Sequence, residues 1–507
     1  MIRSAAAKLV AAFVLLVSLA PTTAHAQPSP PPAEGASSGT DADAITIPTP
    51  PRYTLEGVEI RGNVRTRDRV ILRYIRFKAG MILEVDDPEL DLLRFRLLGT
   101  GFFQTVSLSL RKGSKSGYVY LVVTVSERNT IVVNDVWLGL AAKSDDQGRT
   151  QPLSSYAGVD ISETNLAGTG VTLGGAIGLA ADQLALRVRF LDPAFLGSAW
   201  MTQGILFYNV ARDFYGNQDV LYDDPVGGAT RVQNYAQVRY RRFGGLLGVG
   251  RDLSTSTQLW LDYRLESVSA DLPLAASHRR GKDTEPLTFD LEAGKSVVSS
   301  LRATMVHDTR DSPVLPTHGW FGSLVSDVSL APLGSSYPYE KLQLRLSHWW
   351  PIWRRKGHVA RVEIFGGLIS GSAPVFEKFY PADFSDFLPD RLLELNIDSR
   401  GAPNLLRTSI AEVRHGDYAG KISGEYRIPI YRGSRAIYGI DAFVSAGLYA
   451  IAAQRDITDP ARGYRGLARA PADLTFNLGL RMDTKAGGFL FAFANVLGFL
   501  PVFGGRE

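Results

Sequence analysis

The two-residue periodicity of the chain from Thr130 onward is the feature that most limits its fold. In the segment 341–346, KLQLRL, three leucines alternate with lysine, glutamine and arginine, and the segments 184–190 and 236–241 alternate in the same way. Such strands face either water in a soluble sheet or, in a membrane barrel, lipid on the apolar side and an aqueous lumen on the polar side. The pattern predicts a mainly β fold.

The N-terminus favours the membrane barrel. Arg3 and Lys8 precede an apolar run from Leu9 to Ala20, and Ala24-His25-Ala26 has the small-x-small form of a signal-peptidase site. Residues 1–26 are therefore predicted to be a signal peptide. No later run of about 18 apolar residues exists, so no membrane-spanning helix is predicted and a membrane domain has to be a β-barrel.

Length and composition set further limits. The 507 residues include no Cys and carry a formal charge of +4, which argues against disulfides, thiolate chemistry and an extended nucleic-acid surface. Residues 27–51 are rich in Pro, Ser and Ala and predict an extended linker. At roughly 23 residues per strand and connection, the roughly 370 residues that remain after residue 129 predict a transmembrane antiparallel β-barrel of about 16 strands over 130–507. A large secreted β-sandwich or propeller is the alternative.

Residues 52–129 predict a small α/β domain of order βααββ. Thr66 can cap its first helix, and Asp87 followed by Pro88 can start its second. Its strands are expected at 53–60, 103–110 and 118–125. This order, together with the stretches GNVRTRDRVILRYI and LLGTGFFQTVSL, resembles a POTRA domain, the periplasmic module of the BamA/TamA outer-membrane assembly family.

Short stretches of the second region resemble the barrel of the same family. NLAGTG at 165–170 is similar to its NxxGTG pattern, and FLDPAF at 190–195 is similar to its FxDPxF hairpin. The most specific match is to its DxRDxPxxPxxG turn, carried here by Asp308, Arg310, Asp311, Pro313, Pro316 and Gly319. Proline cannot donate to a strand ladder, so this segment predicts a rigid turn between two strands. Its mixed charges favour a solvated salt-bridge cluster over a metal site.

A long insertion at about 380–416 separates two plainly alternating strands. It greatly exceeds the ~2 to 5 residues of a common hairpin loop, and its many leucines make it too apolar for a disordered segment. PVFEKFY before it and GEYRIP after it resemble the strands that flank the inward-folding sixth loop of the family. The resemblance implies that the tip, Arg400-Gly401, contacts Glu425 in the next strand, while Ser445 occupies the position of a second expected acid.

The resemblance also implies a lateral seam between the first and last barrel strands. The seam residues are expected to be Ile131, Val133, Phe489, Phe491 and Phe493. The implied function is outer-membrane protein assembly or translocation, in which POTRA capture and a laterally opening barrel insert client barrels or export a polypeptide. The alternatives are a polypeptide secretion pore, a small-molecule porin and a surface-adhesion barrel.

Catalytic chemistry is not expected. The GKS at 294–296 lacks the first glycine of a phosphate-binding loop, since residue 289 is Phe289. His348-Trp349-Trp350 and Trp353 predict an aromatic girdle at a membrane interface. We therefore expect no enzyme activity, no cofactor and no metal. The expected location is the Gram-negative outer membrane with the POTRA-like domain in the periplasm. The expected partners are unfolded clients, the lipid bilayer and accessory periplasmic proteins or lipoproteins, without nucleic acid.

Overall fold

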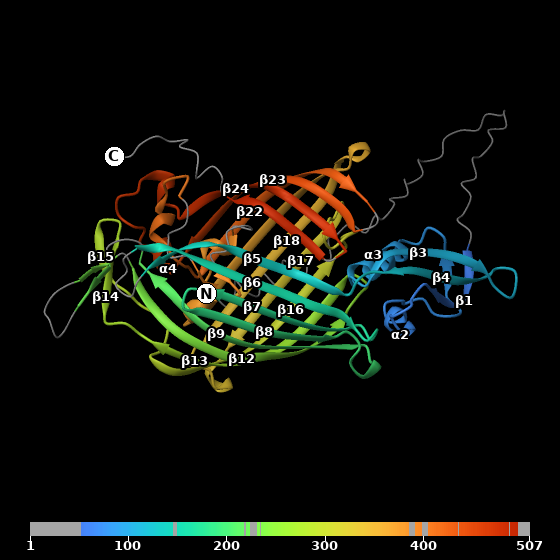
Figure 1. Cartoon of the computed structure of the whole chain (residues 1–507), viewed down its shortest axis with the longest axis horizontal. Helices are drawn as coiled ribbons and strands as arrows, with labels where there is room; N and C mark the ends of the chain where they lie inside the picture. Colours follow the sequence, from blue (N-terminus) through green and yellow to red (C-terminus); the bar gives the residue numbers. More distant parts are fainter. Residues whose placement is uncertain are drawn as a thin grey trace, which may run out of the picture.

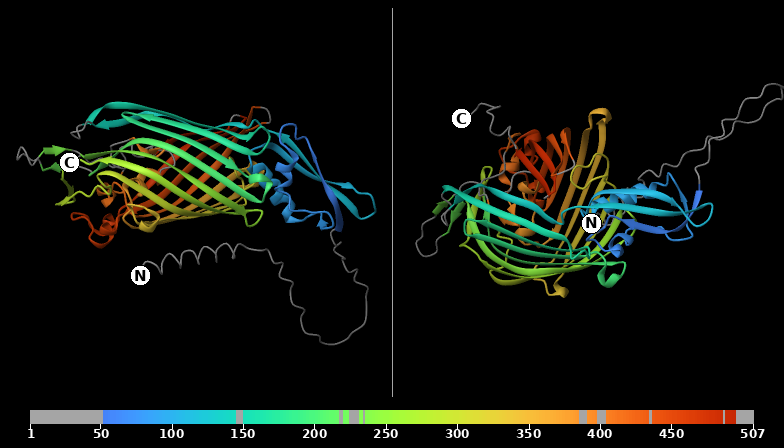
Figure 2. Two further views of the ribbon diagram at one scale, coloured as in Figure 1. Left: turned by 90° about the horizontal axis from the view of Figure 1, so that it is seen from below. Right: turned by 45° about the vertical axis from the view of Figure 1, so that its right-hand side comes forward.

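The protein consists of a small N-terminal domain beside one end of a large β-barrel (Figure 1). The computed structural model describes residues 52–144, 150–216, 220–223, 231–233, 235–384, 391–397, 404–433, 436–485 and 487–494. The predicted signal peptide and linker lie outside these ranges. We call the barrel end next to the N-terminal domain the proximal end and the opposite end the distal end; Figure 2 shows this arrangement from two further sides.

The N-terminal domain confirms the predicted order and adds one short strand. Its elements are β1 (Arg52–Arg61), α2 (Asp68–Leu72), β2 (Ile82–Glu84), α3 (Pro88–Gly99), β3 (Phe103–Lys112) and β4 (Tyr118–Glu127). The sheet order is β2-β1-β4-β3, with β1 parallel to β4. Leu93 and Leu97 of α3 are buried against Leu121 in the sheet. The helices therefore cover one face of a four-stranded sheet.

The helix starts differ from each other. Asp87 caps α3 as predicted, because its side chain accepts a 2.9 Å hydrogen bond from the Glu89 N–H. The prediction that Thr66 caps α2 is wrong. The N-cap residue of α2 is Arg67, and its side chain makes no capping hydrogen bond. Thr66 is buried instead, and its N–H donates to the Glu127 carboxylate at 2.6 Å. Burial tends to raise the pKa of Glu127, but the N–H groups of Thr66 and Arg65 lower it overall.

One antiparallel sheet forms the barrel. In the described part of the chain it contains 15 strands, close to the about 16 expected, and it confirms the mainly β fold. The strands are β5 (Ile131–Ser144), β6 (Thr150–Leu166), β7 (Val171–Ala180), β8 (Gln183–Asp192), β9 (Trp200–Tyr215), β12 (Ala236–Asp252), β13 (Thr257–Asp271), β16 (Gly294–Asp308), β17 (Gly319–Ser329), β18 (Tyr339–Trp353), β19 (His358–Gly371), β22 (Tyr418–Arg432), β23 (Ile437–Ala452), β24 (Ala472–Thr484) and β25 (Gly487–Ala494). No helix among the described residues is long and apolar enough to cross a membrane.

Short elements fill the connections. A second sheet at the distal end contains β10 (Val220–Tyr222), β11 (Arg231–Gln233), β14 (Ala276–Arg280) and β15 (Asp283–Pro286), next to the helix α4 (Gln454–Thr458). The strands β20 (Arg391–Leu392) and β21 (Leu395–Asn396) form a small hairpin. The 3-10 turns are η1 (Phe195–Gly197), η2 (Ala331–Leu333), η3 (Arg354–Lys356), η4 (Val375–Glu377), η5 (Pro381–Phe384), η6 (Ser409–Glu412) and η7 (Gly466–Arg469).

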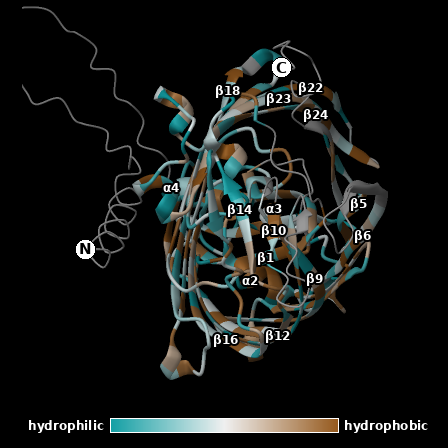
Figure 3. Ribbon diagram, turned by 90° about the vertical axis from the view of Figure 1, so that its left-hand side faces the viewer, coloured by the Kyte–Doolittle hydropathy of each residue, from teal (hydrophilic) through white to brown (hydrophobic). Residues whose placement is uncertain are grey.

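Most strands place apolar residues outside and polar residues inside. On β13, Leu261 and Leu265 are about half exposed on the outer face, while Arg264 and Glu266 are buried on the inner face. The end-on view in Figure 3 shows the barrel strands as a ring around the lumen. The distal part of β12 reverses the expected phase, because Val238 is fully buried inside and its neighbours Arg239 and Arg241 are exposed. The prediction that the apolar side of 236–241 faces outward is therefore wrong, since the lumen is filled at that level.

The N-terminal domain is fixed to the proximal turns of the barrel. Asn165 at the end of β6 donates to the Thr66 hydroxyl at 2.8 Å, and the Arg67 N–H donates to the Gly168 carbonyl at 3.0 Å. On α3, Arg96 pairs with Asp252 and donates to the Ser254 carbonyl at 2.9 Å. These contacts lie on different turns, so the domain spans part of the proximal opening.

Gly168 lets the domain approach this closely. Its φ is +72°, and a side-chain carbon there would lie 1.9 Å from the Arg65 carbonyl oxygen. We expect Gly168→Ala to separate the domain from the β6–β7 turn. Gly197→Ala is the matched control, because Gly197 has a φ of +76° but open space around it. Both variants carry a backbone strain of about 1–2 kcal/mol, and Gly168→Ala alone adds a steric clash. Distances between spin labels on α3 and β13 will report the separation; equal distances in both variants would contradict the prediction.

Candidate functional site

The described part of the connection between β19 and β22 lies inside the barrel. We call residues 372–417 the lumen loop. Its described part contributes a large share of the barrel's buried apolar core: Ala373, Val375, Phe376, Phe379, Tyr380, Phe384, Leu395, Ile397, Ile410 and Val413. Phe379 packs directly on the wall at Gly367, where a side-chain carbon would lie 2.4 Å from its ring. The glycine thus leaves room for an aromatic ring of the loop.

Hydrogen bonds with uncharged donors anchor the loop to β8 and β9. The buried Asp213 carboxylate accepts bonds from Tyr380 and Asn396 of the loop, each at 3.0 Å, and from Tyr240 of β12 at 2.6 Å. Gln183 of β8 donates to the Asn396 carbonyl at 2.8 Å. Polar groups that the loop removes from water are therefore satisfied by the wall.

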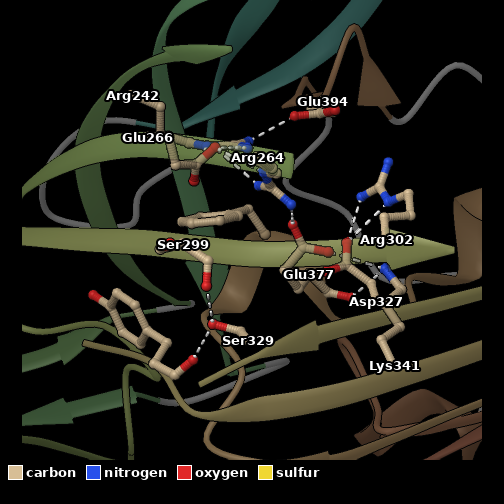
Figure 4. Close-up of polar contacts among 12 residues, drawn as sticks. Arg242, Arg264, Glu266, Ser299, Arg302, Asp327, Ser329, Lys341, Glu377 and Glu394 are labelled. Atoms are coloured by element: carbon tan, nitrogen blue, oxygen red, sulfur yellow. Dashed lines mark hydrogen bonds and ion pairs between the residues drawn. The ribbon is translucent and has the colours of Figure 1, made fainter. Parts of the chain in front are cut away.

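A network of charged side chains joins the loop to the wall (Figure 4). We call it the ion network; its members are Arg242, Arg264, Glu266, Lys341, Glu377 and Glu394. Glu377 of η4 receives Arg264 at 2.6 Å and Lys341 at 3.2 Å. Glu394 receives Arg242 at 2.7 Å. On the wall, Glu266 lies between the two arginines, at 2.9 Å from Arg264 and 3.0 Å from Arg242.

The wall side chains at the centre of the ion network are deeply buried, whereas Glu394 is 42% exposed and also receives Arg187 of β8 at 3.2 Å. The side chains of Arg242, Arg264 and Glu266 are 2%, 6% and 0% exposed. Three basic groups face three carboxylates, and the planar guanidinium groups contact more than one partner each. Removal of one member of such a buried network leaves a charge without compensation, which costs more than the loss of an exposed pair. In this network the wall supplies all the basic groups and the loop supplies two acids.

Glu377→Gln is expected to loosen the lumen loop. The variant removes the charge that Arg264 and Lys341 contact, so the docked loop should lose about 3 kcal/mol while the barrel stays folded. Protease cleavage within residues 372–417 of the full-length protein in membranes should become faster. Glu292→Gln is the control, because Glu292 is an exposed carboxylate after β15 with no ion pair among the described residues. Equal cleavage of the two variants would contradict the prediction.

A histidine lies near the end of the loop. His415 contacts the rings of Tyr215 and Tyr380, with centroid distances of 5.4 and 5.7 Å. Burial, followed by the nearby charges of Lys378 and Arg414, lowers the pKa of His415 to about 3. The docked loop therefore holds this side chain neutral.

Acid is expected to weaken loop docking through His415. Because its pKa lies below the ordinary 6.5 in the docked loop, a proton binds more tightly once the loop is released. The stabilisation is full above about pH 6.5 and falls toward pH 3, by up to about tenfold in the docking equilibrium per pH unit. Hydrogen exchange of residues 404–417 at pH 7.5 and pH 5 will measure it, with His415→Gln as the comparison. A variant as pH-sensitive as the wild type would exclude this histidine as the cause.

Glu425 lies among wall arginines. Its carboxylate receives Arg481 of β24 at 2.7 Å, with Arg361 and Arg427 at 3.7 and 3.8 Å. Arg400 and Gly401 lie outside the described residues, so their pairing with Glu425 stays a prediction. Ser445 lies in the facing position of β23 and accepts a 3.3 Å hydrogen bond from Asn477.

The predicted turn motif connects β16 and β17 at the proximal end. Arg310 forms a bidentate pair with Asp308, and Asp311 accepts the N–H groups of Thr317 and His318 at 2.7 and 3.2 Å. At Gly319 the φ of +110° places a potential side-chain carbon 2.4 Å from the Thr309 carbonyl. Pro313 and Pro316 lie between these groups, and the Pro316 carbonyl accepts a bond from Arg427. The carboxylates therefore hold the turn. No group of three or more acidic or histidine side chains in the described ranges could bind a metal.

The predicted seam residues lie on the two edges of the sheet. Ile131 and Val133 belong to β5, and Phe489, Phe491 and Phe493 belong to β25. Among the described residues, β5 pairs only with β6 and β25 only with β24. Since every neighbouring pair is antiparallel, the 15 strands place β5 and β25 in the same direction. The edges approach at their proximal ends, where a side-chain carbon at Gly487 would lie 2.5 Å from the Val133 oxygen.

The aromatic girdle is present with one correction. Trp320, His348 and Trp350 stack on the barrel, with centroid distances of 4.1 and 5.4 Å, and Trp353 is 54% exposed. Trp349 was expected with them but is only 6% exposed and lies near Arg310 and Arg361 inside the barrel. Adjacent strand residues face opposite sides, so His348-Trp349-Trp350 cannot all face outward.

Sequence reasoning did not identify the ion network. Glu377 lies in the PVFEKFY stretch that marked the loop start, but neither the stretch nor the spacing indicated its partners. Arg242 and Arg264 lie on strands where the alternation of polar and apolar residues was the only feature of the sequence that pointed to their position. A surplus of buried-phase arginine on neighbouring strands would have suggested acids in the loop opposite them.

Known proteins share both parts of this architecture. Residues 165–381 match the Omp85 superfamily domain, and residues 53–128 match the POTRA model described as surface antigen variable number repeat. A putative outer membrane protein assembly factor from Treponema pallidum (strain Nichols) is 23% identical over 291 residues, which cover 55% of this chain and 33% of the relative. The chain thus spans about a third of the length of that relative.

Solved structures align with this chain at low sequence identity. CdiB from Escherichia coli aligns with a TM-score of 0.50 and 10% identity, over 87% of this chain and 72% of CdiB. BamA from Haemophilus ducreyi lacking POTRA domains 1–3 aligns with a TM-score of 0.44 and 16% identity, over 87% and 80%.

The fold and the two domain matches define an outer-membrane β-barrel protein with a POTRA domain. The Omp85 superfamily domain at residues 165–381 and the POTRA domain at residues 53–128 support a protein of the BamA/TamA type. The POTRA domain lies on the periplasmic side, so the proximal end of the barrel is periplasmic and the distal end faces the cell exterior.

Proposed function

We propose that this protein assembles client β-barrel proteins in the outer membrane through a seam between β5 and β25. The observation that carries the proposal is the pair of strand edges without partners in the described part of the barrel. An unpaired edge is a template for another strand. Because β5 and β25 run in the same direction, one client strand of opposite direction can pair antiparallel with both.

The POTRA domain supplies a capture surface in this proposal. In its sheet order β2-β1-β4-β3, strand β3 has β4 as its single neighbour. An extended client segment can add to this edge by β-augmentation, in which main-chain hydrogen bonds provide affinity with little sequence demand. The domain is fixed beside the periplasmic opening by the Arg96–Asp252 and Arg128–Asp483 pairs. Captured segments therefore stay near the barrel.

The docked lumen loop favours lateral insertion over passage through the lumen. Its apolar core and the ion network occupy the barrel interior, so a translocated polypeptide would first have to displace a buried, charge-balanced segment. A client that enters at the seam does not need this step. Polypeptide secretion is the second candidate, and it requires release of the loop.

A reversible cross-link across the seam tests the proposal. Val132→Cys with Gly487→Cys places two thiols at the close approach of the edges, since a side-chain carbon at 487 would lie 3.2 Å from Val132 Cγ1. The same carbon would lie 2.5 Å from the Val133 oxygen, so the single Gly487→Cys variant measures the effect of that contact alone. The chain has no other Cys. In cells that depend on this variant, oxidation should deplete outer-membrane barrels, and reduction should restore them, because a closed seam cannot accept a client strand.

The readout separates the candidate functions. The outer-membrane proteome and the secreted fraction are quantified together, with each single Cys variant under the same oxidant as a control. Loss of barrels only in the oxidised double variant supports assembly at the seam. Unchanged barrels with loss of one exported protein would favour secretion, and unchanged levels of both would reject the proposed role of the seam.

A further inference from the structure

The POTRA domain contains an unusually basic segment. Residues 61–78, RGNVRTRDRVILRYIRFK, hold seven basic residues and one acidic residue, an excess larger than the net charge of +4 of the whole chain. The segment covers the end of β1, the following turn and α2. Folding a domain does not require such an excess, since charge of one sign repels itself.

Most of these basic side chains have no acidic partner. Arg65, Arg67, Arg69, Arg76 and Lys78 are exposed, and their side chains form no hydrogen bond or ion pair within the described parts of the chain. Arg65 and Arg67 bind neighbouring groups through backbone atoms. Elsewhere in the domain arginines have acidic partners, as Arg96 with Asp252 and Arg128 with Asp483 show. The free guanidinium groups are therefore available to an external anion.

The helix α2 of the segment contacts the barrel rim near the β6–β7 turn. Gly170, after β6, lies where a side-chain carbon would meet Val70 of α2 at 2.9 Å and Pro193 of the β8–β9 turn at 3.4 Å. Figure 1 shows α2 beside the periplasmic ends of these strands. The basic segment is therefore next to the β6–β7 and β8–β9 turns.

These turns lie at the level of the lipid headgroups. Trp200 follows the β8–β9 turn, is 49% exposed and carries the Arg251 guanidinium 5.4 Å from its ring, as expected for an interfacial aromatic residue. The outward-facing Leu173 lies three residues after Gly170, which is about 10 Å along a strand and less along the membrane normal because strands tilt. The headgroup layer beyond the hydrocarbon core has a similar thickness, about 5–7 Å.

Exposed apolar residues flank the basic side chains. Val64 of the POTRA domain is 90% exposed and Leu196 of the β8–β9 turn is 89% exposed. An apolar tip beside arginines matches a surface that enters the interface with apolar side chains and contacts phosphates with basic ones. We call Val64, Arg65, Arg67, Arg69 and Leu196 the rim patch.

We propose that the rim patch binds the headgroups of anionic phospholipids in the inner leaflet of the outer membrane. The charge of the patch is complementary to lipid phosphates, and the patch continues the periplasmic rim of a barrel that is already in that leaflet. Binding holds α2 against the bilayer and so fixes the direction in which the POTRA edge strand β3 faces. Each arginine near an anionic surface strengthens the contact about fivefold, and salt weakens it.

A spin label in the full-length protein tests this contact. The absence of Cys makes Val64→Cys the only labelled site, and Ser116→Cys, on the exposed β3–β4 turn, is the matched control. The labelled protein is placed in bilayer discs of phosphatidylcholine alone or mixed with phosphatidylglycerol. We expect collisions with oxygen to rise over collisions with a water-soluble nickel chelate at position 64 when phosphatidylglycerol is present, and to fall again at high salt. Position 116 should not change.

Charge reversal separates headgroup binding from simple proximity. Arg65→Glu with Arg67→Glu and Arg69→Glu should remove the phosphatidylglycerol effect, whereas Lys112→Glu with Lys115→Glu, on the far side of the domain, should preserve it. A label at position 64 that responds equally to both lipid mixtures, or that matches position 116, would overturn the proposal. A photocrosslinker at position 64 that yields protein adducts without lipid adducts in cells would also overturn it, in favour of an acidic protein partner.

Discussion

The salt bridges between the lumen loop and the barrel wall are the interaction on which the rest of the architecture depends. Arg264 and Glu377 are both nearly excluded from solvent and 2.6 Å apart. Charges in such a place are tolerated only when each has a partner. Withdrawal of the loop would leave Arg242, Arg264 and Lys341 with Glu266 as the one remaining acid of the network. Docking is therefore cooperative, and the loop is either seated with its whole network or released from all of it.

The docked lumen loop determines whether a polypeptide can pass through the lumen or pairs at the edges of the sheet. The interior is occupied by an apolar core and a balanced network, whereas β5 and β25 leave backbone donors and acceptors at the edges without strand partners in the described ranges. Unpaired backbone groups at membrane depth are costly because lipid offers no hydrogen bonds. The lowest-energy response to a client strand is thus pairing at the edges. The loop favours this route because it fills the lumen, and Trp137 of β5 packs against the apolar core to which the loop contributes.

Local patterns in the sequence were sufficient for the fold but not for the network. Alternation along 184–190 and the Asp87-Pro88 start of α3 are properties of neighbouring residues, and both were predicted correctly. The phase of 236–241 was wrong, because Val238 and Tyr240 face the loop, and no local signal shows that a lumen is filled. Glu377 and Arg264 are far apart in sequence, so their pairing depends on barrel closure and loop path together. The family resemblance predicted the loop, with an arginine at its tip and an acid on the wall. Among the described residues the ion network has the opposite arrangement, with acids on the loop and basic groups on the wall.

Charge is used differently at the two ends of the protein, and this difference follows from solvent access. In the lumen, the buried arginines of the ion network are matched by carboxylates, as Arg242 is by Glu266 and Glu394. On the POTRA domain, Arg65, Arg67 and Arg69 are exposed and unmatched by the chain. Water screens these exposed charges, so they cost little while the headgroup layer is out of reach, and they gain binding energy where phosphates are close. Buried pairs fix the interior of the barrel, and unpaired surface arginines give the domain outside it a preferred position on the membrane.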